Sequence, residues 1–229
     1  MRAIFITGGG SGIGAATARL FAARGWRIGL ADVNAAGLAE TAAACGGAQT
    51  FVMDVRDREA WTRSLDAFTG VGEGKGGGLD VLFNNAGIPS GGPFAQTDWD
   101  LIDRTIAVNF IGVVNGARIG HAYLARTPGS CLLNTASASA IYGSAGLAVY
   151  SATKFAVRAL TEALDGEWHA AGIKVRALVP GFIDTPLLDV AVPGSNRSIR
   201  ETVTGAGLEL TGADAVAKRR GTLSTATGC

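Results

Sequence analysis

The sequence Thr7-Gly8-Gly9-Gly10-Ser11-Gly12-Ile13-Gly14 follows a short buried-strand pattern, Ala3-Ile4-Phe5-Ile6, and decides the fold. Beyond it, apolar residues recur at helical spacing over residues 13–24. The first glycine permits a tight turn, and the later ones let main-chain N–H groups and the helix N-terminus approach a pyrophosphate. No Gly-Lys-Ser/Thr follows, which excludes a P-loop. An ordinary glycine-rich turn is the alternative, but the position between a strand and a helix favours a dinucleotide site.

Strand and helix patterns alternate along the rest of the chain. Strands are expected at 27–31, 50–53, 79–83, 130–134 and 174–179, and helices at about 34–45, 58–68, 99–126 (bent near Asn109) and 148–171. This alternation predicts one doubly wound α/β domain over residues 1–229, a parallel sheet with helices on both faces. We expect a mobile substrate segment at about 186–205. The tail at about 211–229 is atypical, which makes a seventh strand doubtful.

Composition excludes several classes of function. The chain has 229 residues, 48% of them hydrophobic, and a net charge of +1 without long charge runs, so no nucleic-acid or anionic-membrane surface is expected. No apolar run is long enough to span a bilayer, and the N-terminal one is too short for a secretory signal. The three cysteines and two histidines lack metal-ligand spacing. We expect a cytoplasmic enzyme without a metal.

Polar residues end the expected strands where ligands bind in such sheets. Asp32 ends the second strand, about where an acid that binds the adenosine ribose belongs, and would repel a 2′-phosphate. Asp54 and Val55 follow the third strand and would contact adenine. Asn84-Asn85-Ala86-Gly87 follows the fourth and leaves room for the adenosine ribose. The alternatives are a solvated carboxylate at Asp32, a helix N-cap at Asp54 and a generic turn at residues 84–87.

A second group of motifs surrounds the fifth strand. Ser137 follows that strand, and Tyr150-Ser151-Ala152-Thr153-Lys154 comes later on the next expected helix. The Tyr-x-x-x-Lys spacing places Tyr150 and Lys154 on one face of that helix. With a glycine-rich loop upstream, this combination is unlike a chance match.

These motifs together resemble those of the short-chain dehydrogenase/reductase family, from Met1 to about Pro186. The matching elements are the glycine loop at 7–14, Asn-Asn-Ala-Gly at 84–87, Asn109, Ser137, Tyr150, Lys154 and Pro180-Gly181. The chain departs from the family near its end, where a seventh strand and an Asp-Gly-Gly-like segment are usual.

The resemblance implies a Rossmann-type fold and an oxidoreductase that transfers a hydride between NAD(H) and a secondary alcohol or ketone. Tyr150 would be the general acid/base, Ser137 would bind the substrate oxygen, and Asn109 would hold a water that connects Lys154 to bulk. Lys154 at about 4 Å would lower the pKa of Tyr150 by about three units at an effective dielectric near 20, before desolvation opposes this effect. The implied NAD-binding residues are Gly8, Ser11, Gly12, Ile13, Gly14, Asp32, Val33, Asp54, Val55, Asn85, Ala86, Gly87, Tyr150, Lys154, Pro180, Gly181, Ile183 and Thr185.

The substrate is less well defined by the sequence. Ser137, Ser139, Tyr150 and Phe182 are the expected substrate-binding residues, and their small or apolar neighbours suit an uncharged alcohol or ketone. One alternative is a carboxylated or carrier-bound ketone held by Arg197 or Arg200, although the pattern favours solvated arginines. Another is a catalytically idle dinucleotide-binding regulator.

The helix of Tyr150 also indicates assembly. Ala152, Ala156, Ala159 and Ala163 form a small-residue stripe apart from the face of Tyr150 and Lys154. Such a stripe suits close helix–helix packing, with the helix of residues 109–126 as neighbour, and the family commonly forms a two-fold interface there. We expect a homodimer or homotetramer. Alanines that merely favour a solvated helix are the alternative.

Overall fold

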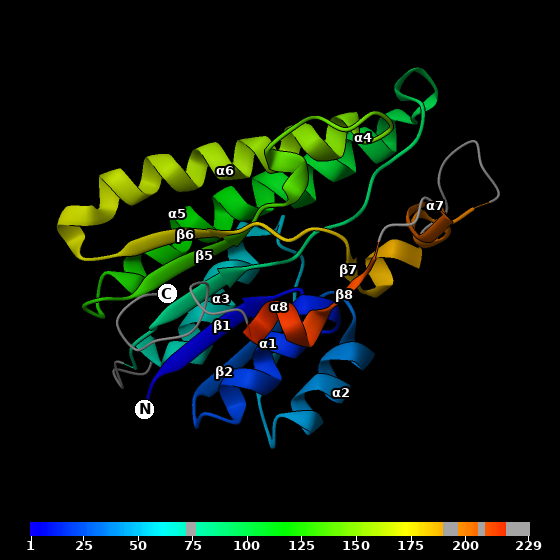
Figure 1. The fold of residues 1–229 in the computed structure, drawn as a ribbon. Coiled ribbons are helices and arrows are strands. Elements are labelled where there is room, and N and C mark those ends of the chain that lie inside the picture. Colours follow the sequence, from blue (N-terminus) through cyan, green and yellow to red (C-terminus); the bar gives the residue numbers. More distant parts are fainter. Residues whose placement is uncertain (72–76, 190–196, 206–208, 219–229) are drawn as a thin grey trace.

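A parallel sheet organises the computed structural model, which describes residues 1–71, 77–189, 197–205 and 209–218. Within these residues the main sheet has six strands in the order β3-β2-β1-β4-β5-β6 (Figure 1). The strands are β1 (Ala3–Thr7), β2 (Arg27–Asp32), β3 (Gln49–Val52), β4 (Val81–Asn84), β5 (Cys131–Thr135) and β6 (Lys174–Leu178). The order reverses between β1 and β4, which confirms the doubly wound, Rossmann-type fold.

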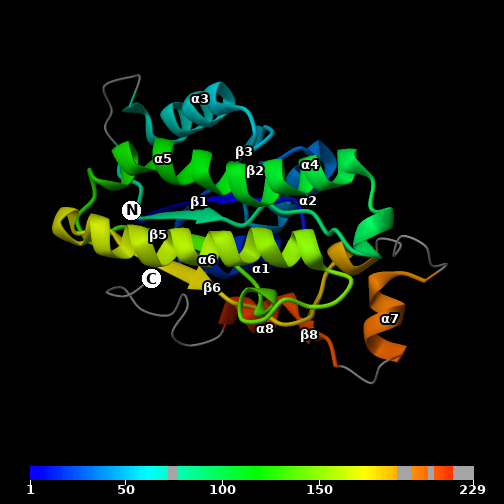
Figure 2. The same ribbon diagram turned by 90° about the horizontal axis from the view of Figure 1, so that it is seen from above.

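Helices cover both faces of this sheet (Figures 1 and 2). One face carries α1 (Gly12–Ala22), α2 (Ala35–Ala44) and α8 (Ala213–Lys218); the other carries α3 (Arg58–Thr69), α4 (Trp99–Ile106), α5 (Gly112–Leu124) and α6 (Ala148–Trp168). Alternate residues of β1 enter the two cores, Phe5 packing among the residues of α3 and Ile4 and Ile6 among those of α1. Burial on both faces explains why this strand is continuously apolar.

The expected bend near Asn109 is confirmed. A π-helical segment, η3 (Ala107–Ile111), joins α4 to α5 and contains the fully buried Asn109. Such segments frequently occur at functional sites. Short 3₁₀ turns, η2 (Phe94–Gln96), η4 (Ala138–Ala140), η5 (His169–Ala171) and η6 (Pro186–Asp189), complete the loops.

The C-terminal part departs from the expected strand pattern. In the described residues no main-sheet strand follows β6; instead β7 (Ile183–Asp184) pairs with β8 (Thr211–Gly212) in a separate small sheet. An unexpected helix, α8, packs on α1 by burying Val216 and Ala217, with an Arg19–Asp214 ion pair at 3.2 Å. Helix α7 (Ile199–Gly205) precedes it. The expectations for 190–196 and 219–229 lie outside the described residues.

Two further observations concern surfaces. No helix in the described ranges is long and apolar enough to cross a membrane. On α6, Lys154, Val157 and Thr161 are buried against the protein, while the alanine stripe faces outward: Ala152, Ala159 and Ala163 are exposed and Ala156 is half-buried. The neighbouring Phe155 is 41% exposed. This surface of α6 is available for a second copy of the chain.

We therefore predict self-association through α6. The wild-type protein should sediment as a dimer or larger species at micromolar concentration, and Ala159→Arg should shift it towards the monomer because a long charged side chain prevents close packing. The matched control is Ala67→Arg, which changes an exposed alanine on α3. A wild-type protein that is fully active as a clean monomer would contradict the prediction.

Candidate active site

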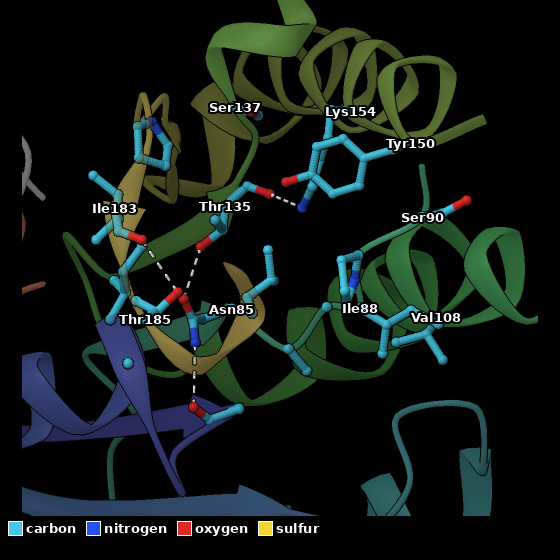
Figure 3. A pocket seen from close by; sticks show the side chains of 18 of the residues that line it. Asn85, Ile88, Ser90, Val108, Thr135, Ser137, Tyr150, Lys154, Ile183 and Thr185 are labelled. Carbon is cyan, nitrogen blue, oxygen red and sulfur yellow. Dashed lines mark hydrogen bonds between the residues drawn. The ribbon is translucent and has the colours of Figure 1, made fainter. Parts of the chain in front are cut away.

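A cavity of about 680 Å³ lies beyond the carboxyl ends of the strands (Figure 3). Its lining includes every residue expected to bind cofactor or substrate, or to act in catalysis, except Gly14 and Asn109. Asp32, Asp54 and Val55 line it together with Tyr150 and the residues that follow β5 and β6. Residues that are far apart in the sequence thus share one cavity.

The glycine loop leaves no room for side chains. A Cβ on Gly14 would lie 2.1 Å from the Gly8 carbonyl oxygen, and one on Gly8 would lie 2.9 Å from the Ala86 Cα. Gly8 (φ +65°) and Gly12 (φ +52°) also adopt left-handed conformations. The N-cap Ser11 makes no side-chain capping bond, so the first turn of α1 presents uncapped N–H groups beside the lining residues Gly12 and Ile13. This arrangement fits a pyrophosphate. Gly14 contributes by close packing and does not line the cavity.

Asp32 is held by the backbone around it. Its Oδ2 accepts a hydrogen bond from Gly10 N at 3.0 Å, and its Oδ1 accepts one from Asn34 N at 3.0 Å. The half-buried carboxylate therefore has a fixed position at the cavity wall and is more than a solvated strand end.

Asp54 has a partner that the sequence analysis missed. The Arg56 side chain donates to both carboxylate oxygens of Asp54 at 2.6–3.0 Å, and this bonding lowers the pKa of Asp54. The helix-cap alternative for Asp54 is wrong, because Asp57 caps α3 by accepting from Glu59 N and Ala60 N. Arg56 also lines the cavity, as does Arg104 on α4, and neither belonged to a motif.

The residues after β4 connect three strand ends. The Asn85 amide donates to the Thr7 carbonyl at 3.1 Å and accepts from the Thr135 hydroxyl at 3.1 Å. Asn84 is 3% exposed and donates to Asn134 Oδ1 at 3.0 Å. A generic turn would not show this bonding. The amide of Asn85 binds protein groups, whereas Ala86 and Gly87 line the cavity beside it.

Asn109 fixes the chain that leaves β4. Its Oδ1 accepts from Ile88 N at 2.8 Å and its Nδ2 donates to the Ile88 carbonyl at 2.9 Å. A Cβ on Gly87 would lie 3.3 Å from Asn109 Oδ1 and 3.8 Å from Lys154 Nζ. Asn109 therefore lies close to Lys154, but its side-chain amide is committed to Ile88.

Tyr150, Ser137 and Lys154 gather at one end of the cavity (Figure 3). Lys154 is 3% exposed, its Nζ donates to the Thr135 carbonyl at 2.8 Å, and this nitrogen lies 5.6 Å from the centroid of the Tyr150 ring. The Ser137 hydroxyl lies near enough to Tyr150 to influence its pKa, and Ser137 Oγ accepts from Ser139 N at 3.2 Å.

Burial dominates the electrostatics of this group. It raises the pKa of Tyr150, against a smaller lowering by the hydrogen bond with Ser137, and it lowers the pKa of Lys154 to about 8. The expected lowering of the Tyr150 pKa by Lys154 is therefore wrong for this structure. Lys154 is itself desolvated, and its ammonium group is directed to Thr135.

The chain after β6 closes another side of the cavity. Pro180 O accepts from Ala138 N at 2.8 Å, and the Thr185 hydroxyl donates to the Ile183 carbonyl at 3.4 Å. Gly181 and Phe182, the latter 37% exposed, line the cavity between them. Pro180, Gly181, Phe182, Ile183 and Thr185 thus line the same cavity as Tyr150.

Comparison with known proteins agrees with this geometry. The sequence model described as short chain dehydrogenase matches residues 2–195. The chain is 37% identical over 190 residues to "Probable oxidoreductase EphD" of Mycobacterium tuberculosis, covering 81% of this chain but only 31% of that protein. It is 33% identical over 186 residues to "2,5-dichloro-2,5-cyclohexadiene-1,4-diol dehydrogenase LinX" of Sphingobium indicum, covering 80% of this chain and 73% of that one.

Solved structures give the same result. Levodione reductase matches with a TM-score of 0.82 and 30% identity, covering 94% of this chain and 87% of that one. The 3-ketoacyl-(acyl-carrier-protein) reductase of Brucella melitensis, complexed with NADH, matches with a TM-score of 0.82 and 29% identity, covering 95% and 88%. From its sequence motifs, its doubly wound sheet and these relatives, the chain belongs to the short-chain dehydrogenase/reductase family of oxidoreductases.

Proposed function

We propose that the protein transfers a hydride between NAD(H) and a secondary alcohol or ketone, with Tyr150 as the general acid/base. The observation that carries the proposal is that one cavity holds Tyr150, Ser137 and Lys154 together with Asp32 and the glycine loop. The matched structure from Burkholderia phymatum is described in complex with NAD, and the one from Brucella melitensis with NADH. When bound, the nicotinamide supplies or accepts the hydride.

The residues of the cavity would divide the cofactor among them. The N–H groups at the start of α1 suit the pyrophosphate, and the fixed carboxylate of Asp32 suits the adenosine ribose hydroxyls. Asp54, Val55 and the segment 85–87 would enclose the rest of the adenosine. We assign Val33, which follows Asp32, to the adenosine ribose. Lys154 is assigned to the nicotinamide ribose and the segment 180–185 to the nicotinamide.

The charge state of Tyr150 suits proton donation. Because its pKa is raised, the hydroxyl stays protonated at neutral pH, and this is the form that protonates a carbonyl oxygen during reduction. Ser137, which lines the cavity with Tyr150, would hydrogen-bond the same oxygen as negative charge develops on it. Lys154, with a pKa of about 8, is able to pass a proton onward. Asn109, close to Lys154, would act in the proton path indirectly, by fixing the position of Ile88.

An uncharged substrate agrees with the groups that line the Tyr150 end of the cavity. Arg200 is paired with Asp184 and Asp189 and is not a free receptor for a carboxylate. Among the described residues at the Tyr150 end, Ser139, Tyr142, Leu147 and Phe182 line the cavity with hydroxyl and apolar groups. An idle regulator is disfavoured, since Ser137, Tyr150 and Lys154 are all in place.

Turnover and the role of Tyr150 can be tested together. In a panel of secondary alcohols with NAD, followed by the absorbance of the reduced nicotinamide, the wild type should turn over at least one member. Tyr150→Phe should lower kcat at least about a hundredfold while NADH binding changes little, because the missing hydroxyl acts in the transition state. Activity of the variant within about tenfold of wild type would refute the assignment of Tyr150.

Asp32 should determine the choice of cofactor. We expect wild type to prefer NAD over NADP, because a 2′-phosphate would contact a carboxylate of like charge. Asp32→Ala should narrow the ratio of kcat/KM values for the two cofactors by about tenfold. Equal or better efficiency of the wild type with NADP would show that Asp32 does not have this role.

The buried Lys154 should make stability depend on pH. Its pKa of about 8 lies below the ordinary 10.5, so the unfolded chain binds the proton more tightly. The free energy of unfolding should therefore rise as pH increases from about 8 to about 10.5, by up to about 3 kcal/mol, and this contribution is lost as pH falls through 8. Urea unfolding at both ends of this range should show a smaller rise for Lys154→Met. Equal rises in the two proteins would count against a buried ammonium.

A further inference from the structure

Arg200 on α7 binds three groups on the chain that precedes it. Its Nε donates to Asp189 Oδ1 at 2.6 Å, its Nη1 to Asp184 Oδ1 at 2.5 Å and its Nη2 to the Thr185 carbonyl at 3.1 Å. All three nitrogens of the guanidinium are thus used, and the two carboxylates raise the pKa of Arg200 further above its ordinary value. The side chain connects α7 to both β7 and η6.

Thr185, one of the three residues that Arg200 binds, belongs to a wall of the cavity. Thr185 lines the cavity, and a Cβ on Gly12 would lie only 3.0 Å from its methyl group, so this residue lies directly on the glycine loop. The Thr185 carbonyl also accepts from Leu188 N at 3.0 Å, and Leu188 is 4% exposed. Leu188 and Ile199, the residue before Arg200, both line the cavity.

The Arg200 side chain therefore links the wall formed by Leu188 and Ile199 to the wall where Thr185 meets the glycine loop. Removing the guanidinium would leave Asp184 and Asp189 as unpaired like charges and would free the Thr185 carbonyl from one of its two donors. Thr185 would then be held less firmly against Gly12, and α7 would lose the ion pair of Arg200 with Asp189 in η6.

We propose that Arg200 is a positioning residue, which holds α7 and η6 against the cofactor-facing loop through Thr185, Asp184 and Asp189. The proposal rests on the proposed function, because the loop is assigned to the nicotinamide end of NAD(H). It also gives Arg200 a role other than that of an anion receptor for a carboxylated substrate. Arg200 acts through its neighbours and touches no reacting atom.

The experiment measures the dissociation constant of NADH by fluorescence, with Arg200→Met as the main variant. We expect NADH binding to weaken about tenfold, with a rise in KM that exceeds the fall in kcat, since displaced walls cost binding before chemistry. Arg200→Lys should recover only part of the loss, because one ammonium group cannot span three acceptors. The matched control is Arg63→Met on α3, which removes an arginine near Asp57 (3.8 Å) and Glu59 (3.4 Å) outside the cavity and should leave NADH binding unchanged.

The outcomes separate this proposal from its alternatives. If Arg200→Met binds NADH within twofold of wild type, the positioning role of Arg200 is overturned, while the proposed function is unaffected. Failure of the wild type to bind NADH would instead refute the proposed function. If Arg200→Met loses activity with levulinate but keeps it with the neutral ethyl ester, Arg200 is an anion receptor, and the positioning role is overturned. If Arg200→Met does not fold, Asp184→Asn and Asp189→Asn should each weaken NADH binding, and unchanged binding in both would also overturn the proposal.

Discussion

The site depends on the hydrogen bonds of one half-buried side-chain amide, that of Asn85. Asn85 directly follows β4, and its amide binds both neighbouring strand ends, donating to Thr7 on β1 and accepting from Thr135 on β5. The carbonyl of Thr135 in turn accepts from Lys154. One connected group of hydrogen bonds therefore joins the point at which the strand order reverses to the lysine ammonium. A parallel sheet supplies such a point only where the strand order reverses.

Burial then determines what the site residues are able to do. Lys154 is surrounded by protein, so its ammonium is disfavoured, while the neutral hydroxyl of Tyr150 is favoured. Both shifts have one cause. Burial favours the neutral form of each group, so the pKa of Tyr150 rises and the pKa of Lys154 falls. A lysine with a pKa of about 8 and a tyrosine that retains its proton form a donor pair that suits carbonyl reduction at neutral pH.

Short-range patterns in the sequence predicted much of this. The glycine loop, the spacing of Tyr150 and Lys154 and the bend at Asn109 involve residues within a few positions of one another, so local geometry defines them. The pairing of Arg200 with Asp184, the bonds of Asn109 to Ile88 and the packing of α8 on α1 join residues distant in sequence. Such contacts depend on the tertiary fold, which periodicity does not encode. The raised pKa of Tyr150 was missed for the same reason, because burial is a tertiary property.

The two ends of the cavity are held in physically different ways. The nucleotide end consists of glycines without room for a Cβ and of buried amides, so most substitutions there would displace the backbone. The substrate end is lined by partly exposed side chains such as Tyr142 and Phe182. Loop side chains tolerate change far better than a packed backbone does. One cofactor framework is thus able to serve different substrate walls, which agrees with relatives named for a cyclohexadiene diol, levodione and a carrier-bound ketoacyl group.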